Sequence, residues 1–207
     1  MSSTPAIWST LRHRQFRALW RSGGVYFIGN AMQVMAAAWM MIELTGSDFL
    51  AAAVQTAVFL PMFLLSLPAG VLADTTDRRR LILAALLTQA AAGAILAALL
   101  FAGWAGPGAL MFFIFIAGCC TALLSPAYNS TIADVVPREE LPAAITAMSI
   151  AYNAARAVGP VVAGLVFAIG GVWNFVLCVA CTLLMAQTIR RWPITGSRAQ
   201  SAEPALL

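Results

Sequence analysis

The feature of this sequence that most restricts its fold is a set of long stretches without a charged residue. They cover 22–42, 49–73, 81–133, 141–155 and 157–189, and they are 21, 25, 53, 15 and 33 residues long. One helical crossing of a bilayer takes about 20 apolar residues. The chain is 61% hydrophobic and only 10% charged, whereas a soluble domain carries about 25% charged residues. The sequence therefore predicts an all-α polytopic membrane protein, and it excludes a water-soluble core and a disordered chain.

The number of crossings depends on Arg156, which separates the last two stretches. The first two stretches give one span each, and the third gives two because helix-breaking residues fill 103–108. If Arg156 lies outside the membrane, 157–189 forms a fifth and last span. If it lies inside, Gly170 and Gly171 separate a fifth span from a sixth. With six spans, the other eleven arginines all fall on one side, so the positive-inside rule favours six spans with both termini cytoplasmic in the plasma (inner) membrane.

We therefore expect three regions. Residues 1–20 form a cytoplasmic arm with a short interfacial helix, 21–191 a six-span bundle, and 192–207 a disordered cytoplasmic tail. The expected spans are approximately 21–44, 49–73, 81–103, 107–133, 141–169 and 172–190. The net charge of +4 comes from arginines placed by this topology, so we expect the lipid bilayer, and not a nucleic acid, as the partner of the basic residues.

Nothing in the sequence indicates an enzyme, a metal site or a cofactor. The motifs of metalloproteases, serine hydrolases and phosphate-binding loops are absent. Cys178 and Cys181 have the spacing of half a zinc site, but all four cysteines lie in expected spans. The only histidine, His13, lies in the basic arm. We expect the cysteines to act as small packing residues and His13 to be solvated.

Polar side chains recur at helical steps of three or four in three expected spans. The members are Asn30 and Gln33, then Ser125 and Asn129, then Ser149, Asn153 and Arg156. Such stripes either join helices together or line a water-filled substrate cavity. Arg156 favours the cavity, because no carboxylate has a comparable expected depth, although a purely structural polar anchor stays an alternative. Its expected contacts are backbone carbonyls, Asn or Ser side chains, water, or an anionic group of a substrate.

The fifth span also contains Gly159, Pro160 and Gly164. Proline inside a helix removes a backbone hydrogen bond and permits a kink, and glycine permits close approach of a neighbouring helix. These residues predict a bend or hinge.

The loop between the second and third spans reads Gly-Val-Leu-Ala-Asp-Thr-Thr-Asp-Arg-Arg-Arg over 70–80. It resembles the signature loop of the major facilitator superfamily, G-x-L-A-D-R-x-G-R-[KR], with departures at Thr75 and Asp77. The segments 16–20, 29–33, 44–47 and 153–160 resemble the enterobactin-exporter branch of that superfamily. The resemblance implies a cytoplasmic latch, formed here by Gly70, Asp74, Arg78, Arg79 and Asp134.

The resemblance also implies one half of a transporter. Members of the superfamily have two six-helix halves, each built of inverted 3+3 repeats, with the substrate between the halves. A chain of this length supplies the first half alone. The expected function is therefore secondary active export of a small molecule by alternating access, with a second copy of this chain or another six-span chain. The alternative is a truncated remnant or an interaction subunit that does not transport.

Overall fold

The computed structural model describes residues 7–191, with the side chains of Ile7, Trp8 and Asp74 left out. The described chain consists of helices and short connections. In chain order these are η1 (Ile7–Arg12), α1 (Arg14–Thr45), α2 (Asp48–Thr75), α3 (Arg78–Phe101), α4 (Pro107–Val135), η2 (Arg138–Glu140), α5 (Leu141–Phe167) and α6 (Val172–Arg190). All six α-helices are long and apolar enough to cross a membrane, which confirms the predicted all-α, six-span fold.

Two boundaries settle alternatives that the sequence left open. Arg156 lies inside α5, and the chain breaks between Phe167 and Val172, so the alternative of one helix over 157–189 is wrong. A short interfacial helix before the first span was expected within 1–20, and this prediction is wrong for the second half of that range. Residues 14–20 form the first turns of α1, and only η1 is a separate helix. The expected disordered tail at 192–207 lies outside the described residues.

The helix ends are fixed by local chemistry. Gly46 adopts the left-handed conformation at φ 64°, and its N–H donates to the Ile42 carbonyl at 2.7 Å, which ends α1. The Ser47 hydroxyl then accepts a hydrogen bond from the Leu50 N–H at 3.3 Å and begins α2. Asp77 caps α3 in the same way by accepting from the Arg80 N–H at 3.1 Å. These caps explain how consecutive long helices are joined by so few residues.

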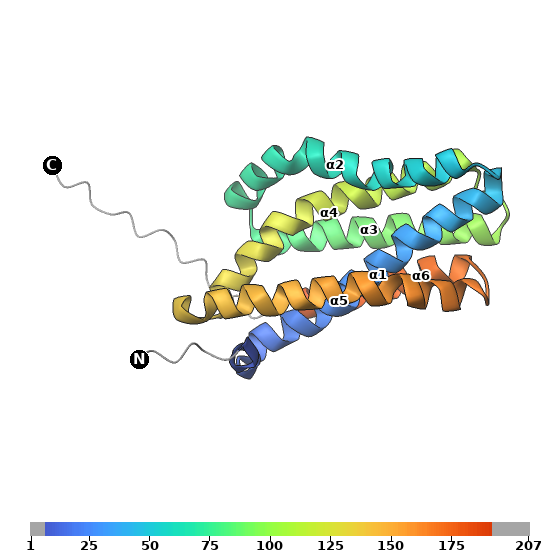
Figure 1. The fold of residues 1–207 in the computed structure, drawn as a ribbon. Helices are drawn as coiled ribbons and strands as arrows, with labels where there is room; N and C mark the ends of the chain where they lie inside the picture. Colours follow the sequence, from blue (N-terminus) through green and yellow to red (C-terminus); the bar gives the residue numbers. More distant parts are fainter. Residues whose placement is uncertain (1–6, 192–207) are drawn as a thin grey trace.

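α1 runs through the middle of the bundle and packs against α2, α4, α5 and α6, whereas α3 packs on α4 and α6 (Figure 1). The contact of α5 with α1 is made by small residues. Its buried positions are Ala143, Ala144, Ala147, Met148, Ala151, Ala155, Gly159 and Ala163. Small side chains at an interface let two helix backbones approach closely, which is the usual basis of helix packing in membranes.

α2 and α5 are the least covered helices. In their most apolar stretches, 22% and 17% of the residues are buried, against 39–56% in the other four helices. In Figure 1 these two helices lie along opposite edges of one side of the bundle, with α1 and α4 between them. We call this side the open face.

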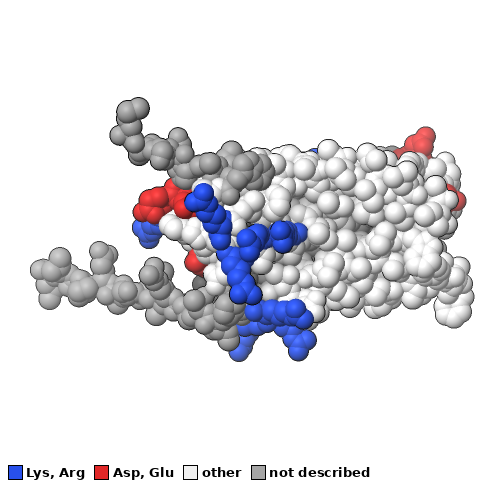
Figure 2. Space-filling view, turned by 90° about the horizontal axis from the view of Figure 1, so that it is seen from below, with Lys and Arg blue, Asp and Glu red and all other residues white. Residues whose placement is uncertain are grey.

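Most arginines gather at one end of the bundle in Figure 2, acidic residues lie at both ends, and most of the long middle of the visible surface is uncharged. The end with most arginines is formed by the start of α1, the α2–α3 and α4–α5 connections, and the end of α6. We call it the arginine end.

Candidate functional site

The exposed surface of α5 divides into a polar and an apolar stripe. Each runs along the helix at steps of three or four residues, so each occupies its own side. The polar stripe consists of Thr146, Ser149, Asn153 and Arg156, and the apolar stripe of Ile150, Ala154, Ala157 and Val161; all eight side chains are exposed. Lipid covers an apolar stripe readily, but a polar stripe requires polar partners or water. The polar stripe is therefore the surface of α5 that lipid suits least.

Three members of the polar stripe bond along their own helix. The Thr146 hydroxyl donates to the Pro142 carbonyl at 2.9 Å, and the Ser149 hydroxyl donates to the Ile145 carbonyl at 3.0 Å. The Asn153 amide nitrogen donates to the Ser149 carbonyl at 2.8 Å. These donors are satisfied without a second helix, so they leave oxygen acceptors on the surface of the stripe.

Arg156 differs from its neighbours because it carries a charge without a counter-charge. It is the one charged side chain in the central half of any of the six described α-helices. Fifteen residues separate it from Leu141, which places it roughly 22 Å along the helix axis. The described residues give it no ion pair; its guanidinium carbon lies 5.7 Å from the centre of the Tyr152 ring, within the range of a cation–π contact.

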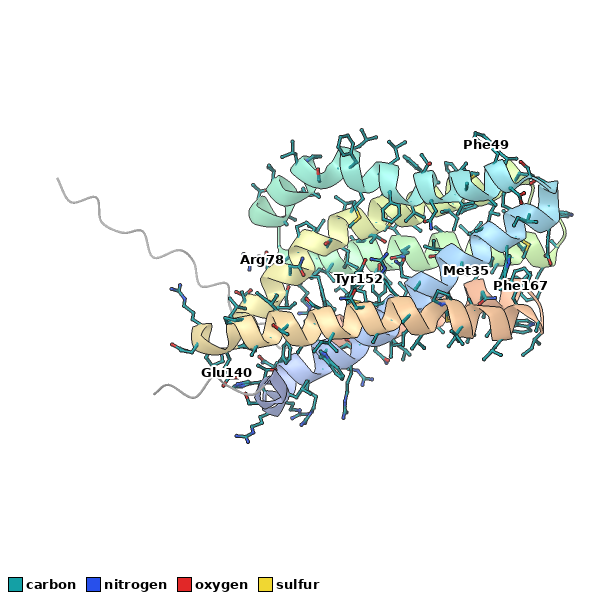
Figure 3. All side chains as sticks on the ribbon, viewed as in Figure 1. Met35, Phe49, Arg78, Glu140, Tyr152 and Phe167 are labelled. Carbon is teal, nitrogen blue, oxygen red and sulfur yellow. The ribbon has the colours of Figure 1, made fainter. Side chains whose placement is uncertain are left out.

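Tyr152 connects Arg156 to an aromatic cluster that the sequence did not predict. The three tyrosines of the chain, Tyr26, Tyr128 and Tyr152, all meet Phe27 of α1 edge to face, with ring centres 5.8, 6.1 and 5.2 Å away. Tyr152 is labelled in Figure 3 beside α5, on the side of that helix toward the middle of the bundle. The Tyr128 hydroxyl donates to the Leu19 carbonyl at 3.0 Å. The cluster therefore joins α1, α4 and α5 beside Arg156.

A second polar group lies wholly inside the bundle. The Tyr26 hydroxyl donates to the Gln89 side-chain oxygen at 3.0 Å and lies 3.4 Å from the Thr121 hydroxyl. Gln89 is 3% exposed, and its side-chain nitrogen has no partner in the described structure. Gln89 was not among the residues predicted to form a site, although it is the only amide side chain in the apolar stretch 81–101.

Asn30 and Gln33 line a small cavity between the helices and do not lie on the polar stripe. The cavity has a volume of about 10 Å³ and is also lined by Thr121, Val58 and Gly118. This is the space of about one water molecule. Gln33 is 4% exposed, and its side-chain oxygen accepts a weak hydrogen bond from the Cys178 thiol at 3.4 Å. Gln33 is therefore an interior group in this conformation, and Asn30 is half-buried beside it.

Ser125 and Asn129 occupy a third place, on α4. Ser125 is half-buried and Asn129 is exposed. The structure thus divides the seven predicted cavity residues among the interior, α4 and the polar stripe of α5. The last set alone includes a charge.

Two of the five residues predicted to form the latch, Arg78 and Asp134, meet at the arginine end. An Arg78 guanidinium nitrogen lies 2.8 Å from an Asp134 carboxylate oxygen, and Arg79 donates to the Arg190 carbonyl at the end of α6. These contacts tie α3 to α4 and to α6. A Cβ on Gly70 would meet nothing within 4 Å. The side chain of Asp74 lies outside the described residues.

His13 also belongs to this end, and it makes a contact that the sequence did not predict. Its Nε2 lies 3.1 Å from the Glu140 carboxylate, and both side chains are partly buried, at 37% and 26% exposure. The contact joins the start of α1 to the α4–α5 connection, near the position where Glu140 is labelled in Figure 3. A separation of 127 residues explains why the sequence alone did not reveal it.

The predicted hinge residues lie at a tight crossing of α1 and α5. A Cβ on Gly159 would lie 2.5 Å from the Ala31 Cβ and 3.3 Å from the Ile28 carbonyl oxygen. One on Gly164 would lie 3.3 Å from the Trp39 ring. Pro160 lies inside α5. The geometry gives both glycines a packing role, and the hinge stays a prediction.

Comparison with known proteins gives matches over 70% or more of the chain. Residues 5–205 match the family described as transmembrane secretion effector. Macrolide efflux protein A of Streptococcus pyogenes is 30% identical over 92% of this chain and 48% of its own length. Macrolide efflux protein A of Enterococcus faecalis is 31% identical over 70% of this chain and 46% of its own length. The staphyloferrin A transporter of Staphylococcus aureus is 24% identical over 72% of this chain and 38% of its own length. The chain spans about half the length of the curated relatives it matches.

Proposed function

This chain belongs to the transmembrane secretion effector family, within the major facilitator type of transporter, and we propose on that premise that it is one half of an exporter of small molecules. The observation that carries the proposal is the polar stripe of α5, with Arg156 exposed near the middle of a membrane-spanning helix. Exposure of such a polar and charged surface to lipid is energetically unfavourable. A second six-helix bundle across the open face would enclose it together with α1, α2 and α4.

The second bundle is either another copy of this chain or a separate six-span chain. Relatives about twice as long support a partner of similar size to this one. Export would proceed by rocking of the two bundles, which exposes the enclosed surface to each side of the membrane in turn. The eleven arginines outside α5 support a cytoplasmic arginine end in the plasma (inner) membrane.

The latch would act at this end. Arg78 and Asp134 form an ion pair with side chains 41% and 62% exposed. An exposed pair of this kind contributes about 0–1 kcal/mol, which suits a contact that breaks and re-forms in each cycle.

The test of this function is oligomeric state together with transport. The protein is reconstituted into phospholipid vesicles, and its mass is measured by native mass spectrometry after release from the same lipid. Macrolides and staphyloferrin A, after which the relatives are named, are the first probes of movement across the vesicle wall. Homodimers that move a probe support the proposal. A monomer that moves none, alone and with the product of any adjacent six-span gene, supports the alternative of a non-transporting remnant or interaction subunit.

Neutralising the latch should change the conformational bias with little change in stability. For Asp134→Asn, we expect the free energy of unfolding to fall by about 1 kcal/mol or less, while a cysteine introduced at Thr76 reacts with maleimide several-fold faster or slower. Asp74→Asn should act in the same direction and should change probe affinity less than conformational bias. Arg80→Gln is the control, because its only acidic contact in the described chain is Asp77, at 3.9 Å on the same helix end. Labelling rates equal to the parent in both Asp variants would contradict the latch.

A further inference from the structure

The charges around the polar stripe restrict the chemistry of the cargo, a conclusion that rests on the proposed function. Arg156 is positive, and the described acids with known side-chain positions all lie at helix ends or connections. Glu43 and Asp48 flank the α1–α2 connection, at the end opposite the arginine end. Asp77, Asp134, Glu139 and Glu140 are at the arginine end. The middle of the bundle therefore has a net positive charge.

The neighbours of Arg156 cannot neutralise that charge. Ser149 and Asn153 are uncharged and bond along their own helix. Tyr152 offers the face of its ring to the guanidinium. The Arg156 side chain is exposed, so the N–H groups along the planar edge of its guanidinium stay open, and this edge matches the two oxygens of a carboxylate or phosphate.

A second copy of this chain would strengthen the effect. It would bring another Arg156 to the enclosed space and no acid at the same level, since each copy has the same charges. Two like charges near each other repel, and an anion between them is attracted by both and offsets that repulsion.

We propose that Arg156, with its guanidinium over the Tyr152 ring, binds an anionic group of the transported molecule, of the carboxylate or phosphate class. The site then excludes cations by repulsion and accepts anions by paired N–H donation. The cargo is an organic anion.

The test compares two dyes that share a xanthene core, the anion carboxyfluorescein and the cation rhodamine 123. Binding is measured by fluorescence polarisation to the intact protein in nanodiscs of phosphatidylcholine, which contain no anionic lipid. We expect wild-type protein to bind carboxyfluorescein at least tenfold more tightly than rhodamine 123. Arg156→Gln should lose this preference, and Arg156→Lys should keep part of it, because lysine keeps the charge but lacks the planar edge.

The matched control is Arg21→Gln, which removes the same charge from an exposed arginine of α1 and should keep the dye preference.

A second measurement does not depend on dye shape. Citrate should raise the melting temperature of the wild type and of Arg21→Gln by several degrees over sodium chloride of equal ionic strength, and should not raise that of Arg156→Gln. A repeat with phosphatidylglycerol in the nanodiscs distinguishes a soluble anion from a lipid phosphate. Loss of the citrate effect there would assign the site to lipid and overturn the cargo proposal.

Equal dye affinities together with no citrate effect that depends on Arg156 would overturn the proposal. Failure of the proposed function gives a different result. Anions would still bind through Arg156, but no probe would cross the vesicle wall. Transport of a cationic or neutral probe that is unchanged by Arg156→Gln would refute the anionic cargo and leave the exporter intact.

Discussion

Export by the Arg156→Ala variant should fall about 10- to 100-fold while the protein still inserts and folds. The expected loss follows from a charge-assisted hydrogen bond, which contributes about 1.5–3 kcal/mol, since about 1.4 kcal/mol corresponds to a factor of ten in rate. Folding should not suffer, because Arg156 has no ion-pair partner among the described residues. Removing an arginine from the centre of a span relieves an insertion penalty of about 2.5–3.5 kcal/mol.

The measurement is initial export rate in vesicles at equal amounts of inserted protein, with the melting temperature recorded for each variant. Arg21→Ala is the control of equal charge and equal truncation, and it should export at the parental rate. Export by Arg156→Ala within twofold of the parent would remove Arg156 from the site. A large drop in inserted protein would instead support the structural anchor, the alternative that the sequence left open.

The six-helix fold was predictable from the sequence because the membrane allows few solutions. A stretch of about 20 apolar residues without charge has to cross as a helix, since its backbone polar groups find no water in the hydrocarbon. The arginine distribution then resolved the ambiguity at Arg156, and the structure confirms a helix on each side of the break near Gly170 and Gly171. The start of α1 was less predictable. Arginine is a good helix former, so Arg14 and Arg17 continue the helix beyond the apolar stretch.

The pairing of side chains across helices was largely beyond sequence reasoning. The tyrosines at 26, 128 and 152 are more than a hundred residues apart at the extremes, and only the packing of α1, α4 and α5 brings them to Phe27. The burial of Gln33 has the same cause. The helical spacing of Gln33 predicts which side of α1 it occupies, but not whether that side faces water or packs against α6. Arg78 and Asp134 were assigned to one latch because a family resemblance supplied the long-range information.

Replacing Gly159 with leucine should destabilise the bundle more than any other single change considered above. Even the first carbon of a side chain would lie 2.5 Å from the Ala31 Cβ, well inside van der Waals contact, and α1 would have to move away. Overfilling a packed interface costs about 1–3 kcal/mol, and leucine should reach the upper end. Gly159→Ala should also destabilise, although alanine gains about 1 kcal/mol of helix propensity over glycine.

Gly24 of α1 is the matched control, because a Cβ there would meet nothing within 4 Å. Gly24→Ala should raise stability by about 0.5–1 kcal/mol, since only the helix propensity changes. Thermal unfolding in a mild detergent compares the stability of each alanine variant with that of the parent. We expect Gly159→Ala to lower the stability and Gly24→Ala to raise it. If Gly159→Ala unfolded at the parental temperature but slowed transport, the glycine would serve as the predicted hinge, because the α1–α5 crossing would then tolerate a methyl group at rest and fail only when the helices move.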